Sequence, residues 1–421
     1  MSYETIKQDL AILVGFSTEL NTQDIMESLN ELERLAQTVS IKTLHKLPQQ
    51  GHSASARTLI GSGKVNEIKR LIAVDHVDMV IFDDALTPAQ LRNLEQDLDI
   101  QVFDRSFLIL SIFAERAHSK ESTLEVALAQ KQYMISRLIG MRASLSRQGG
   151  GSYNAKGPGE TKLELDRRKI LGDITQIKKQ LQKIKTEKQT SRKLRQYNQM
   201  KTVALVGYTN AGKSSMMNAL LKRYSHLEHE TLEKDMLFST IDTKAKKITY
   251  KDHRPYLLID TVGFISKLPT ELVTSFETTL EDVLQADLIL HLIDGTTMSD
   301  VQVKTTEDVL ESLGAKDIPR LYVVTKSDLC ESWPLFDKPY IYTSSKTGDG
   351  LEELMEAIND ALYETYRTFV FNIPFNNMDV YNKLKTRYFV LNEVYDELGV
   401  EVKVFMDPLH LNPYLKYKKE D

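Results

Sequence analysis

Residues 207–214 constrain this chain most, because they form a complete phosphate-binding loop. They are Gly207, Tyr208, Thr209, Asn210, Ala211, Gly212, Lys213 and Ser214. An apolar strand at 203–206 precedes the loop, and we expect a helix to open at Ser215. In such loops backbone N–H groups cradle the phosphates, the lysine reaches the β and γ oxygens, and the hydroxyl binds Mg²⁺. The sequence therefore predicts a nucleoside triphosphate site at residues 207–215.

A second motif follows the apolar residues 257–259, where Asp260 and Gly263 are separated by two residues. We expect Asp260 to hold the Mg²⁺ shell and the Gly263 amide to meet the γ-phosphate. Phe238 and Thr240 lie in the candidate switch segment between the two motifs. The predicted catalytic residues are Lys213, Thr240 and Gly263, and the predicted metal ligands are Ser214, Thr240 and Asp260.

A third motif favours guanine over adenine. Residues 321–324 read as a strand and lead into Thr325, Lys326 and Asp328. The Asp328 carboxylate can accept both N1–H and N2–H of guanine, and adenine has no such donor pair. Another strand, around 340–342, precedes Ser344, Ser345 and Lys346, which we expect to support the guanine carbonyl. Thr325 replaces the usual asparagine, which predicts a weaker brace between base loop and phosphate loop.

Phe264 follows Gly263 where many GTPases place the glutamine that orients the attacking water. A phenyl ring cannot make that hydrogen bond, so we expect slow intrinsic hydrolysis. Another residue, a partner or an ion must then complete the catalytic site. Asn210 allows two interpretations. It matches the asparagine that helps bind a stimulating K⁺ in some GTPases, and it is also typical of a hydrogen-bonded turn.

Residues 1–112 predict a small α/β domain with strands at 11–16, 79–82 and 100–103 and helices at 25–35, 65–72 and 89–98. Gly61, Gly63 and Lys64 resemble a fragment of a phosphate loop. Thr58 and Val65 stand where its glycine and hydroxyl belong, so a turn that opens a helix is the better interpretation. A second nucleotide site is the alternative.

Residues 113–200 predict an arm of two long antiparallel helices, at 121–142 and 163–185, with apolar residues at heptad-like spacing. The glycine-rich segment 149–160 would form a loop at its tip, as functional loops on rigid scaffolds often do. The formal net charge of −5 argues against a protein that coats RNA, yet residues 167–201 are strongly basic. A solvated helix face is the alternative to RNA contact. The candidate RNA contacts are Arg147, Gly149, Gly150, Gly151, Lys156, Gly157, Gly159, Arg167 and Arg168.

The predicted fold class is α/β. A P-loop GTPase domain at 201–365, with a mostly parallel sheet and helices on both faces, follows the small α/β domain and the arm. Residues 366–421 predict a small α/β C-terminal module, with strands at 369–373 and 400–405, a third strand near Phe389 and a helix at 380–384. The single cysteine, Cys330, suggests a packed side chain rather than a reactive thiol. With no signal segment or long apolar stretch, we expect a cytoplasmic protein without a membrane segment.

These residues together resemble the HflX-type GTPases of the Obg-HflX group in the TRAFAC class. The likeness rests on four motifs outside the first domain and on shorter matches within it. The motifs are 157–161, 163–168, 207–215 and 260–265, and the shorter matches lie at 29–36, 61–65 and 91–95.

The resemblance implies a GTPase that binds GTP and GDP, uses Mg²⁺, and binds the large ribosomal subunit through its rRNA. We expect the protein to be a monomer. The resemblance further implies that the arm reaches toward the peptidyl-transferase region and that the GTP-bound protein splits stalled or stress-arrested ribosomes. One alternative is a GTP-regulated RNA-binding factor that acts in large-subunit assembly without splitting. Another is an ATP-using enzyme, whose ATP binding would survive loss of Asp328, whereas a GTPase with Asp328→Asn would shift toward xanthosine triphosphate.

Overall fold

The chain forms two compact units in the computed structural model. Unit 1 contains the described residues up to Lys183 together with Lys267, and unit 2 contains the other described residues. The structure describes residues 9–19, 21–148, 158–197, 200–224, 244–250, 255–267, 282–297, 300–330 and 338–419, and the described side chains exclude those at 136–148, 158–163, 189, 191–197 and 244.

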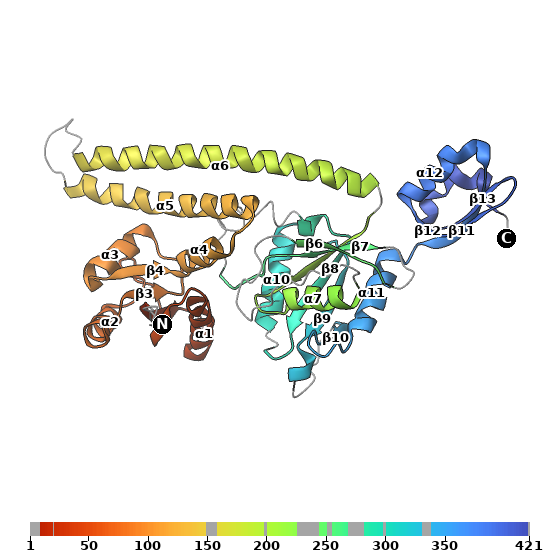
Figure 1. The fold of residues 1–421 in the computed structure, drawn as a ribbon. Helices are drawn as coiled ribbons and strands as arrows, with labels where there is room; N and C mark the ends of the chain where they lie inside the picture. The colour runs from red at the N-terminus through yellow and green to blue at the C-terminus, as the bar shows by residue number, and fades with distance from the viewer. Residues whose placement is uncertain are drawn as a thin grey trace, which may run out of the picture. The chain divides into compact units, whose positions relative to one another are not determined.

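A four-stranded parallel sheet with the order β2-β1-β3-β4 forms the centre of unit 1 (Figure 1). Its strands are β1 (Leu10–Ser17), β2 (Lys42–Gln50), β3 (Met79–Phe82) and β4 (Gln101–Asp104). The middle strands β1 and β3 are buried, whereas the edge strand β2 is half-buried and contains Pro48. Proline is tolerated at an edge because one side of that strand makes no ladder.

Helices cover both faces of this sheet. They are α1 (Thr22–Thr38), α2 (Ser62–Asp75), α3 (Pro88–Leu98) and α4 (Arg105–Arg116). On one face Ile12 and Val14 share a core with Ile68 of α2 and Leu94 of α3. Successive strand residues point to opposite faces, so Gly15 faces α1, where an added Cβ would lie 2.7 Å from Ile25. The result is a three-layer α/β arrangement.

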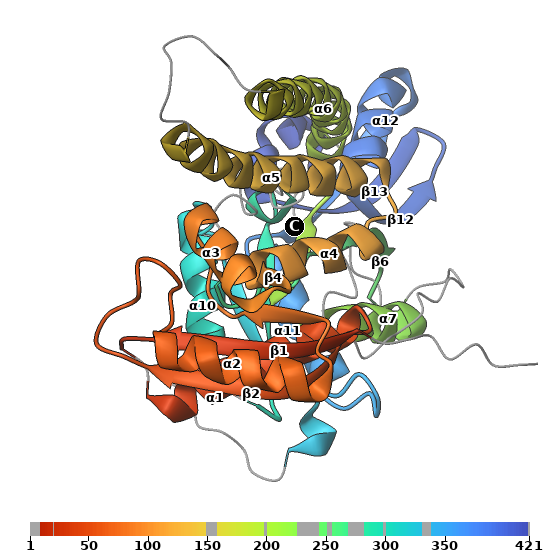
Figure 2. The same ribbon diagram turned by 90° about the vertical axis from the view of Figure 1, so that its left-hand side faces the viewer.

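Two long helices follow, α5 (Lys120–Gln148) and α6 (Pro158–Tyr197). Over the residues of unit 1 they lie side by side in both ribbon views (Figures 1 and 2). Lys131 Nζ of α5 is 2.6 Å from Asp173 Oδ2 of α6. On the predicted apolar seam Ile170 and Leu181 are buried, whereas the neighbouring Leu171 is exposed. The heptad-like spacing therefore gives a helix pair, as predicted.

Charged side chains are paired in the interior of unit 1. The guanidinium of Arg105 is buried, with Nη1 2.6 Å from Asp83 Oδ1 and Nη2 2.5 Å from Glu31 Oε2. Lys267 Nζ lies 2.5 Å from Asp83 Oδ2 and 2.7 Å from Asp84 Oδ1. Burial by itself raises the pKa of Asp83, but the charges of Arg105 and Lys267 outweigh it and hold that pKa below its ordinary value. The pairing offsets the cost of burying these charges.

A six-stranded sheet with the order β10-β9-β8-β5-β7-β6 forms the larger part of unit 2. Its strands are β5 (Thr202–Gly207), β6 (Lys244–Ile248), β7 (Tyr256–Asp260), β8 (Leu288–Asp294), β9 (Arg320–Thr325) and β10 (Tyr340–Tyr342). All neighbouring pairs are parallel except β6 and β7. The predicted mostly parallel sheet is confirmed.

Helices cover both faces of this sheet as well. Within the described residues they include α7 (Lys213–Tyr224), α10 (Asp300–Ser312) and α11 (Leu351–Tyr363), and a short 3-10 helix, η1 (Ser327–Leu329), follows β9. Leu290 and Val323 share one core with Met216 of α7 and Leu354 of α11. Tyr322 lies beside Val323 and points to the other face, where its hydroxyl donates to Glu307 of α10 at 2.8 Å.

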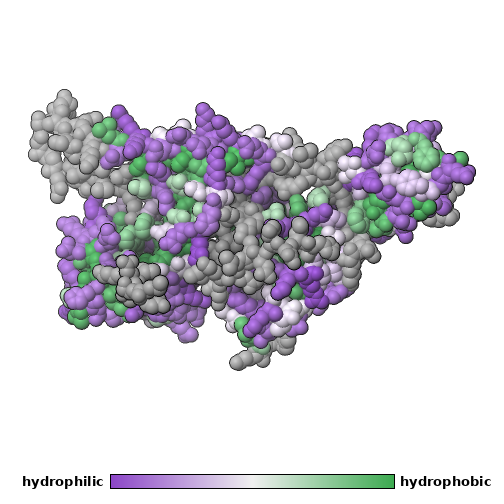
Figure 3. Space-filling model, in the orientation of Figure 1, coloured by the Kyte–Doolittle hydropathy of each residue, from purple (hydrophilic) through white to green (hydrophobic). Residues whose placement is uncertain are grey.

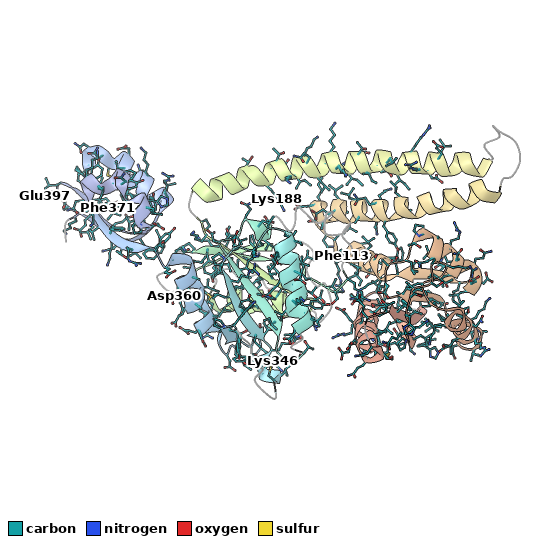
Figure 4. All side chains as sticks on the ribbon, turned by 180° about the vertical axis from the view of Figure 1, so that it is seen from behind. Phe113, Lys188, Lys346, Asp360, Phe371 and Glu397 are labelled. Atoms are coloured by element: carbon teal, nitrogen blue, oxygen red, sulfur yellow. The ribbon has the colours of Figure 1, made fainter. Side chains whose placement is uncertain are left out.

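The C-terminal module belongs to unit 2 and has a three-stranded antiparallel sheet with the order β11-β13-β12. Its elements are β11 (Arg367–Pro374), η2 (Phe375–Asn377), α12 (Met378–Arg387), β12 (Phe389–Tyr395), β13 (Gly399–Met406), η3 (Pro408–His410) and η4 (Asn412–Tyr417). Phe371 of β11 is fully buried inside the module (Figure 4) and packs with Leu384 of α12. The predicted strands and helix of this region are all present.

Several predictions of element bounds were wrong, most of all the end of α6, which was predicted near Lys185 and lies at Tyr197. The helix after the phosphate loop begins at Lys213 rather than Ser215, because the last residues of the loop already adopt the first helical turn. The predicted loop 149–160 extends too far, since α6 begins at Pro158 and therefore includes Gly159. Proline suits a first helical position because its missing N–H would have no helical partner there. Residues 149–157 lie outside the described residues.

Two elements of unit 1 were not predicted. β2 has few large apolar residues and no clear alternation, because it is an edge strand. α4 is an almost continuous apolar run that buries most of its surface, and such a run gives no helical periodicity. The small α/β domain is therefore one strand and one helix larger than expected.

Candidate nucleotide-binding site

Parallel strands bring the predicted motifs to one edge of the six-stranded sheet. β5, β7 and β9 end at Gly207, Asp260 and Thr325, which each begin a motif found in the sequence. In an open parallel sheet, ligands bind outside the carboxyl ends of the strands. The fold therefore gathers residues that are about 120 positions apart into one site.

The phosphate loop packs closely against the strand beside it. A Cβ at Gly207 would lie 2.4 Å from the carbonyl oxygen of Leu292, so only glycine fits where β5 meets β8. Lys213 Nζ donates to the carbonyl oxygens of Gly207 at 3.0 Å and Tyr208 at 2.7 Å. Burial lowers the pKa of Lys213 to about 8, although the negative charge of Asp260 opposes this shift. A phosphate anion in the loop would raise this pKa again, because a nearby opposite charge favours the ammonium form.

Ser214 and Asp260, two of the predicted metal ligands, lie together. The Ser214 hydroxyl donates to Asp260 Oδ2 at 3.0 Å. Asp260 is buried, and the next residue is fixed because Thr261 Oγ1 donates to the carbonyl oxygen of Leu205 at 2.6 Å. Hydroxyl and carboxylate oxygens are the hard ligands that Mg²⁺ prefers. The pair therefore fits a magnesium ion that the phosphates of a bound nucleotide would share.

Phe264 is buried, and its side chain has no polar atom to offer to the site. Its carbonyl oxygen accepts from the backbone N–H of Thr209 at 2.7 Å, and its own N–H donates to the carbonyl oxygen of Gly207 at 3.1 Å. The segment after Asp260 thus pairs with the phosphate loop through its backbone. The side chain supplies no group that orients water, as the sequence indicates.

The base loop is organised around Asp328. Ser344 Oγ donates to Asp328 Oδ1 at 2.7 Å, and Ser344 Oγ also accepts from the backbone N–H groups of Lys346 and Thr347. Ser327 N–H donates to the carbonyl oxygen of Thr343, which joins the loops after β9 and β10. Lys346 lies in the loop between β10 and α11 (Figure 4). The two predicted base motifs therefore form one structure.

Thr325 braces the base loop to the phosphate loop despite replacing asparagine. Its Oγ1 lies 3.0 Å from the carbonyl oxygen of Ala211 and 3.1 Å from that of Ile293. A hydroxyl has one proton and so can donate to only one of these acceptors at a time. The expected brace is present, but it has one donor where an amide would have two.

Sequence reasoning missed Asp294, the last residue of β8. Its Oδ2 accepts from Lys326 Nζ at 2.8 Å, and this ion pair holds the lysine of the base motif. Lys326 has a left-handed backbone with φ of 57°. The available signal was an apolar strand ending in Asp294 and Gly295, the same pattern as the strands of the recognised motifs. Cys330 packs against Gly295, and burial raises the pKa of its thiol, in agreement with a packed side chain.

Several predicted contacts lie outside the described part of the chain. These are Phe238 and Thr240 of the switch segment and Gly149, Gly150, Gly151, Lys156 and Gly157 of the arm. Arg147 and Gly159 are helical, and Arg167 and Arg168 are exposed on α6. In unit 1 Gly61 caps α2 and Lys64 pairs with Glu67 at 2.8 Å, which fits a turn that opens a helix.

The phosphate loop, the Asp260 motif and the guanine-type base loop on a mostly parallel sheet define a P-loop GTPase. Comparison with known families supports this class along most of the chain. A family described as "GTP-binding GTPase N-terminal" matches residues 26–114, "GTP-binding GTPase Middle Region" matches 116–195, and "50S ribosome-binding GTPase" matches 202–326.

The chain belongs to the HflX family of GTPases. It is 42% identical to the GTPase HflX of Caldanaerobacter subterraneus subsp. tengcongensis over 94% of this chain and 90% of that protein. It is 34% identical to the GTPase HflX of Escherichia coli K12 over 94% of this chain and 91% of that protein. A GTP-binding protein from Sulfolobus solfataricus, solved with GDP, is 22% identical over 85% of this chain and 99% of that chain, with a TM-score of 0.43. Membership of the HflX family of GTPases makes the protein an enzyme that hydrolyses GTP.

No helix among the described residues is long and apolar enough to span a membrane.

Proposed function

We propose that this GTPase acts on the large ribosomal subunit and uses its GTP-dependent conformational change to split stalled or stress-arrested ribosomes. The observation that carries the proposal is the incomplete catalytic site. Buried Phe264 leaves no side chain at its position to orient water, while the GTPase region resembles a family described as binding the 50S ribosome. Phosphoryl transfer depends on positioning and charge neutralisation, which a bound partner can supply. The ribosome is the partner that we assign to this role.

In this proposal the phosphate loop, residues 207–215, holds the phosphates of GTP, and Lys213 neutralises the β and γ oxygens. Ser214 and Asp260 would hold Mg²⁺, with Thr240 as the third protein ligand. The ion supplies charge neutralisation on the phosphates. Asp328 reads guanine, with Ser344 orienting its carboxylate at 2.7 Å. The γ-phosphate would order the segment that begins at Asp260, and hydrolysis would release it.

The arm is the proposed RNA contact. Arg167, Arg168 and Lys169 are exposed near the start of α6, and Lys178, Lys179 and Lys183 continue the exposed basic series. Many hydrophilic side chains line this helix in the space-filling view (Figure 3). Exposed cations on a rigid helix suit phosphate-backbone contacts. An arm of this kind fits the rRNA of the large subunit.

The first test is GTP hydrolysis with and without purified large ribosomal subunits. We expect the rate to rise steeply with subunit concentration, because the subunit completes the site. Lys213→Ala is the blank for contaminating activity. A rate at saturating subunits no higher than the rate of the free protein would contradict the proposal. Exchanging K⁺ for Na⁺ in the same assay tests the K⁺ interpretation of Asn210, since a turn residue would leave the rate unchanged.

A role in large-subunit assembly is the competing function, and it needs the same switch and the same basic arm. Sedimentation of intact ribosomes with the protein and a non-hydrolysable GTP analogue separates the two. Splitting predicts that intact ribosomes convert to free subunits when the analogue is present and persist with GDP. Binding to free large subunits without loss of intact ribosomes would favour the assembly role.

A further inference from the structure

We propose that Tyr208 is a positioning residue for GTP hydrolysis, whose hydroxyl fixes residues 263–266 against the phosphate loop. The side chain would act through Gly263, the residue predicted to meet the γ-phosphate. This role is separate from the backbone contacts with phosphate that residues 207–215 are predicted to make. It assigns a function to the one tyrosine of the loop.

The contacts of Tyr208 join the phosphate loop to the segment after Asp260. The backbone N–H of Ser266 donates to Tyr208 Oη at 2.7 Å, and the hydroxyls of Tyr208 and Ser266 share a hydrogen bond of 2.5 Å. Next to them, Tyr208 and Phe264 form a parallel β-bridge through the backbones of Gly207 and Thr209. The bridge needs only backbone atoms. The hydroxyl contacts depend on the tyrosine side chain and therefore can be removed by substitution.

The side chains around this contact are buried, which restricts how they can move. Tyr208 is 6% exposed, Phe264 is 2% exposed and Ile265 is 1% exposed. Lys267 then has a left-handed backbone with φ of 55°, so the chain changes direction directly after Ser266. Non-glycine residues adopt this conformation only where surrounding contacts hold it. Tyr208 thus holds the segment at its last residue before the turn.

Gly263 is placed against the lysine of the phosphate loop by these contacts. A Cβ built on Gly263 would lie 3.0 Å from Lys213 Nζ and 3.0 Å from Thr209 Cα. Because the Phe264 side chain cannot orient water, catalysis depends on how well the backbone of Gly263 is placed. A displacement of about 1 Å at a reacting centre can cost about a hundredfold in rate. Loosening residues 263–266 should therefore slow hydrolysis.

The test replaces the hydroxyl alone with Tyr208→Phe and measures steady-state GTP hydrolysis, GDP affinity and amide hydrogen exchange. We expect kcat to fall by about tenfold, with KM and GDP affinity within about twofold of the wild type. Exchange at residues 261–266 should become faster. Tyr322→Phe is the matched control. It removes another tyrosine hydroxyl of unit 2, the one that donates to Glu307, and should leave kcat unchanged.

Ser266→Ala sharpens the test, because it removes Oγ and keeps the backbone N–H that donates to Tyr208. We expect a smaller loss of kcat than in Tyr208→Phe, and a double variant no slower than Tyr208→Phe, since both changes act on one contact. Unchanged or faster hydrolysis in Tyr208→Phe would overturn the proposal. A parallel loss of GDP affinity and melting temperature would also overturn it, because that pattern indicates a merely structural role.

Discussion

At the residue scale, single side chains connect the motifs of the nucleotide site. Thr325 is the clearest case, because one hydroxyl faces two carbonyl oxygens, those of Ala211 and Ile293. Asp328 is similar, since its carboxylate is oriented by Ser344 from another loop. Such contacts link the predicted guanine-binding loop to the phosphate loop and to the loop after β10. We therefore expect their strength to affect how tightly the site holds a nucleotide.

Thr325→Val should weaken nucleotide binding, because the change keeps the shape of the side chain and removes its only donor. A buried acceptor without its donor costs about 1–3 kcal/mol, so we expect about a tenfold loss of GDP affinity. Titration calorimetry with GDP measures this. Thr325→Ser keeps a hydroxyl and should bind nearly as the wild type does, while Thr325→Asn supplies two donors and should bind at least as tightly. Wild-type affinity in Thr325→Val would show that the brace carries no binding energy.

At the scale of single elements, α6 combines two surfaces. Ile170 and Leu181 are buried along one side, whereas Arg167, Arg168, Lys178 and Lys179 are exposed. A helix can hold both because its side chains project all round the axis, so that one apolar stripe is buried while the other residues face solvent. The apolar side fixes the helix on its partner α5 over the residues of unit 1, and the basic side stays available.

Reversing two of these charges should weaken binding to the large subunit. For Arg167→Glu with Arg168→Glu we expect lower affinity and a salt dependence whose slope falls by about 0.7–0.9 for each lost phosphate contact. Sedimentation or light scattering across a salt series measures both. The matched control reverses Lys304 and Lys316, two exposed lysines of unit 2 in and just after α10. Equal losses in both variants would mean that net charge, and not the arm, drives binding.

At the scale of the whole molecule, two units with separate cores make up the described chain. The interior of unit 1 contains the ion cluster of Arg105, Asp83 and Glu31, joined by Lys267. Lys267 is only four residues beyond Gly263 of the nucleotide site. The stability of unit 1 and the nucleotide affinity of unit 2 should nevertheless respond to different substitutions.

Asp83→Asn should destabilise unit 1 and spare the nucleotide site. Removing one partner from a buried ion pair typically costs about 3–5 kcal/mol. Chemical denaturation should show an earlier transition for unit 1, and GDP affinity should be unchanged. Asp97→Asn is the control, since its partner Arg57 is largely exposed and such pairs contribute little. A loss of GDP affinity in Asp83→Asn would contradict this separation.

The same cluster fixes the pH dependence of unit 1. The folded pKa of Asp83 lies below its unfolded value, so its stabilisation is present above about pH 4 and is lost as the pH falls through the folded pKa. The pKa of Lys267 is raised by Asp83 and Asp84, although burial opposes this, so its contribution is lost only as the pH rises above about 10.4. The acid-induced loss should be smaller in Asp83→Asn, which can be measured by denaturation between pH 3 and 7.

The motifs of the nucleotide site could be predicted because their chemistry depends on residue type and short spacing. Each motif can be recognised in the sequence because it follows an apolar strand. This applies to the loop from Gly207 to Ser214, to Asp260 with Gly263, and to Asp328. Asp294 was missed because its role depends on Lys326, which reaches it only after β8 and β9 pair. The edge strand β2 and the buried helix α4 lack the periodicity that sequence reasoning needs.

By itself the sequence determined the class of nucleotide site, the parallel sheet of the GTPase domain and the helical arm, since all follow from local pattern. Only the tertiary structure decided which distant groups meet. Three contacts join segments that lie between about 60 and 180 positions apart in the sequence. They are the contacts of Thr325 with Ala211, of Tyr208 with Ser266 and of Lys267 with Asp83. Local patterns carry no information on such pairs, because strand order and backbone turns bring them together. The catalytic positioning proposed for Tyr208 belongs to this second group.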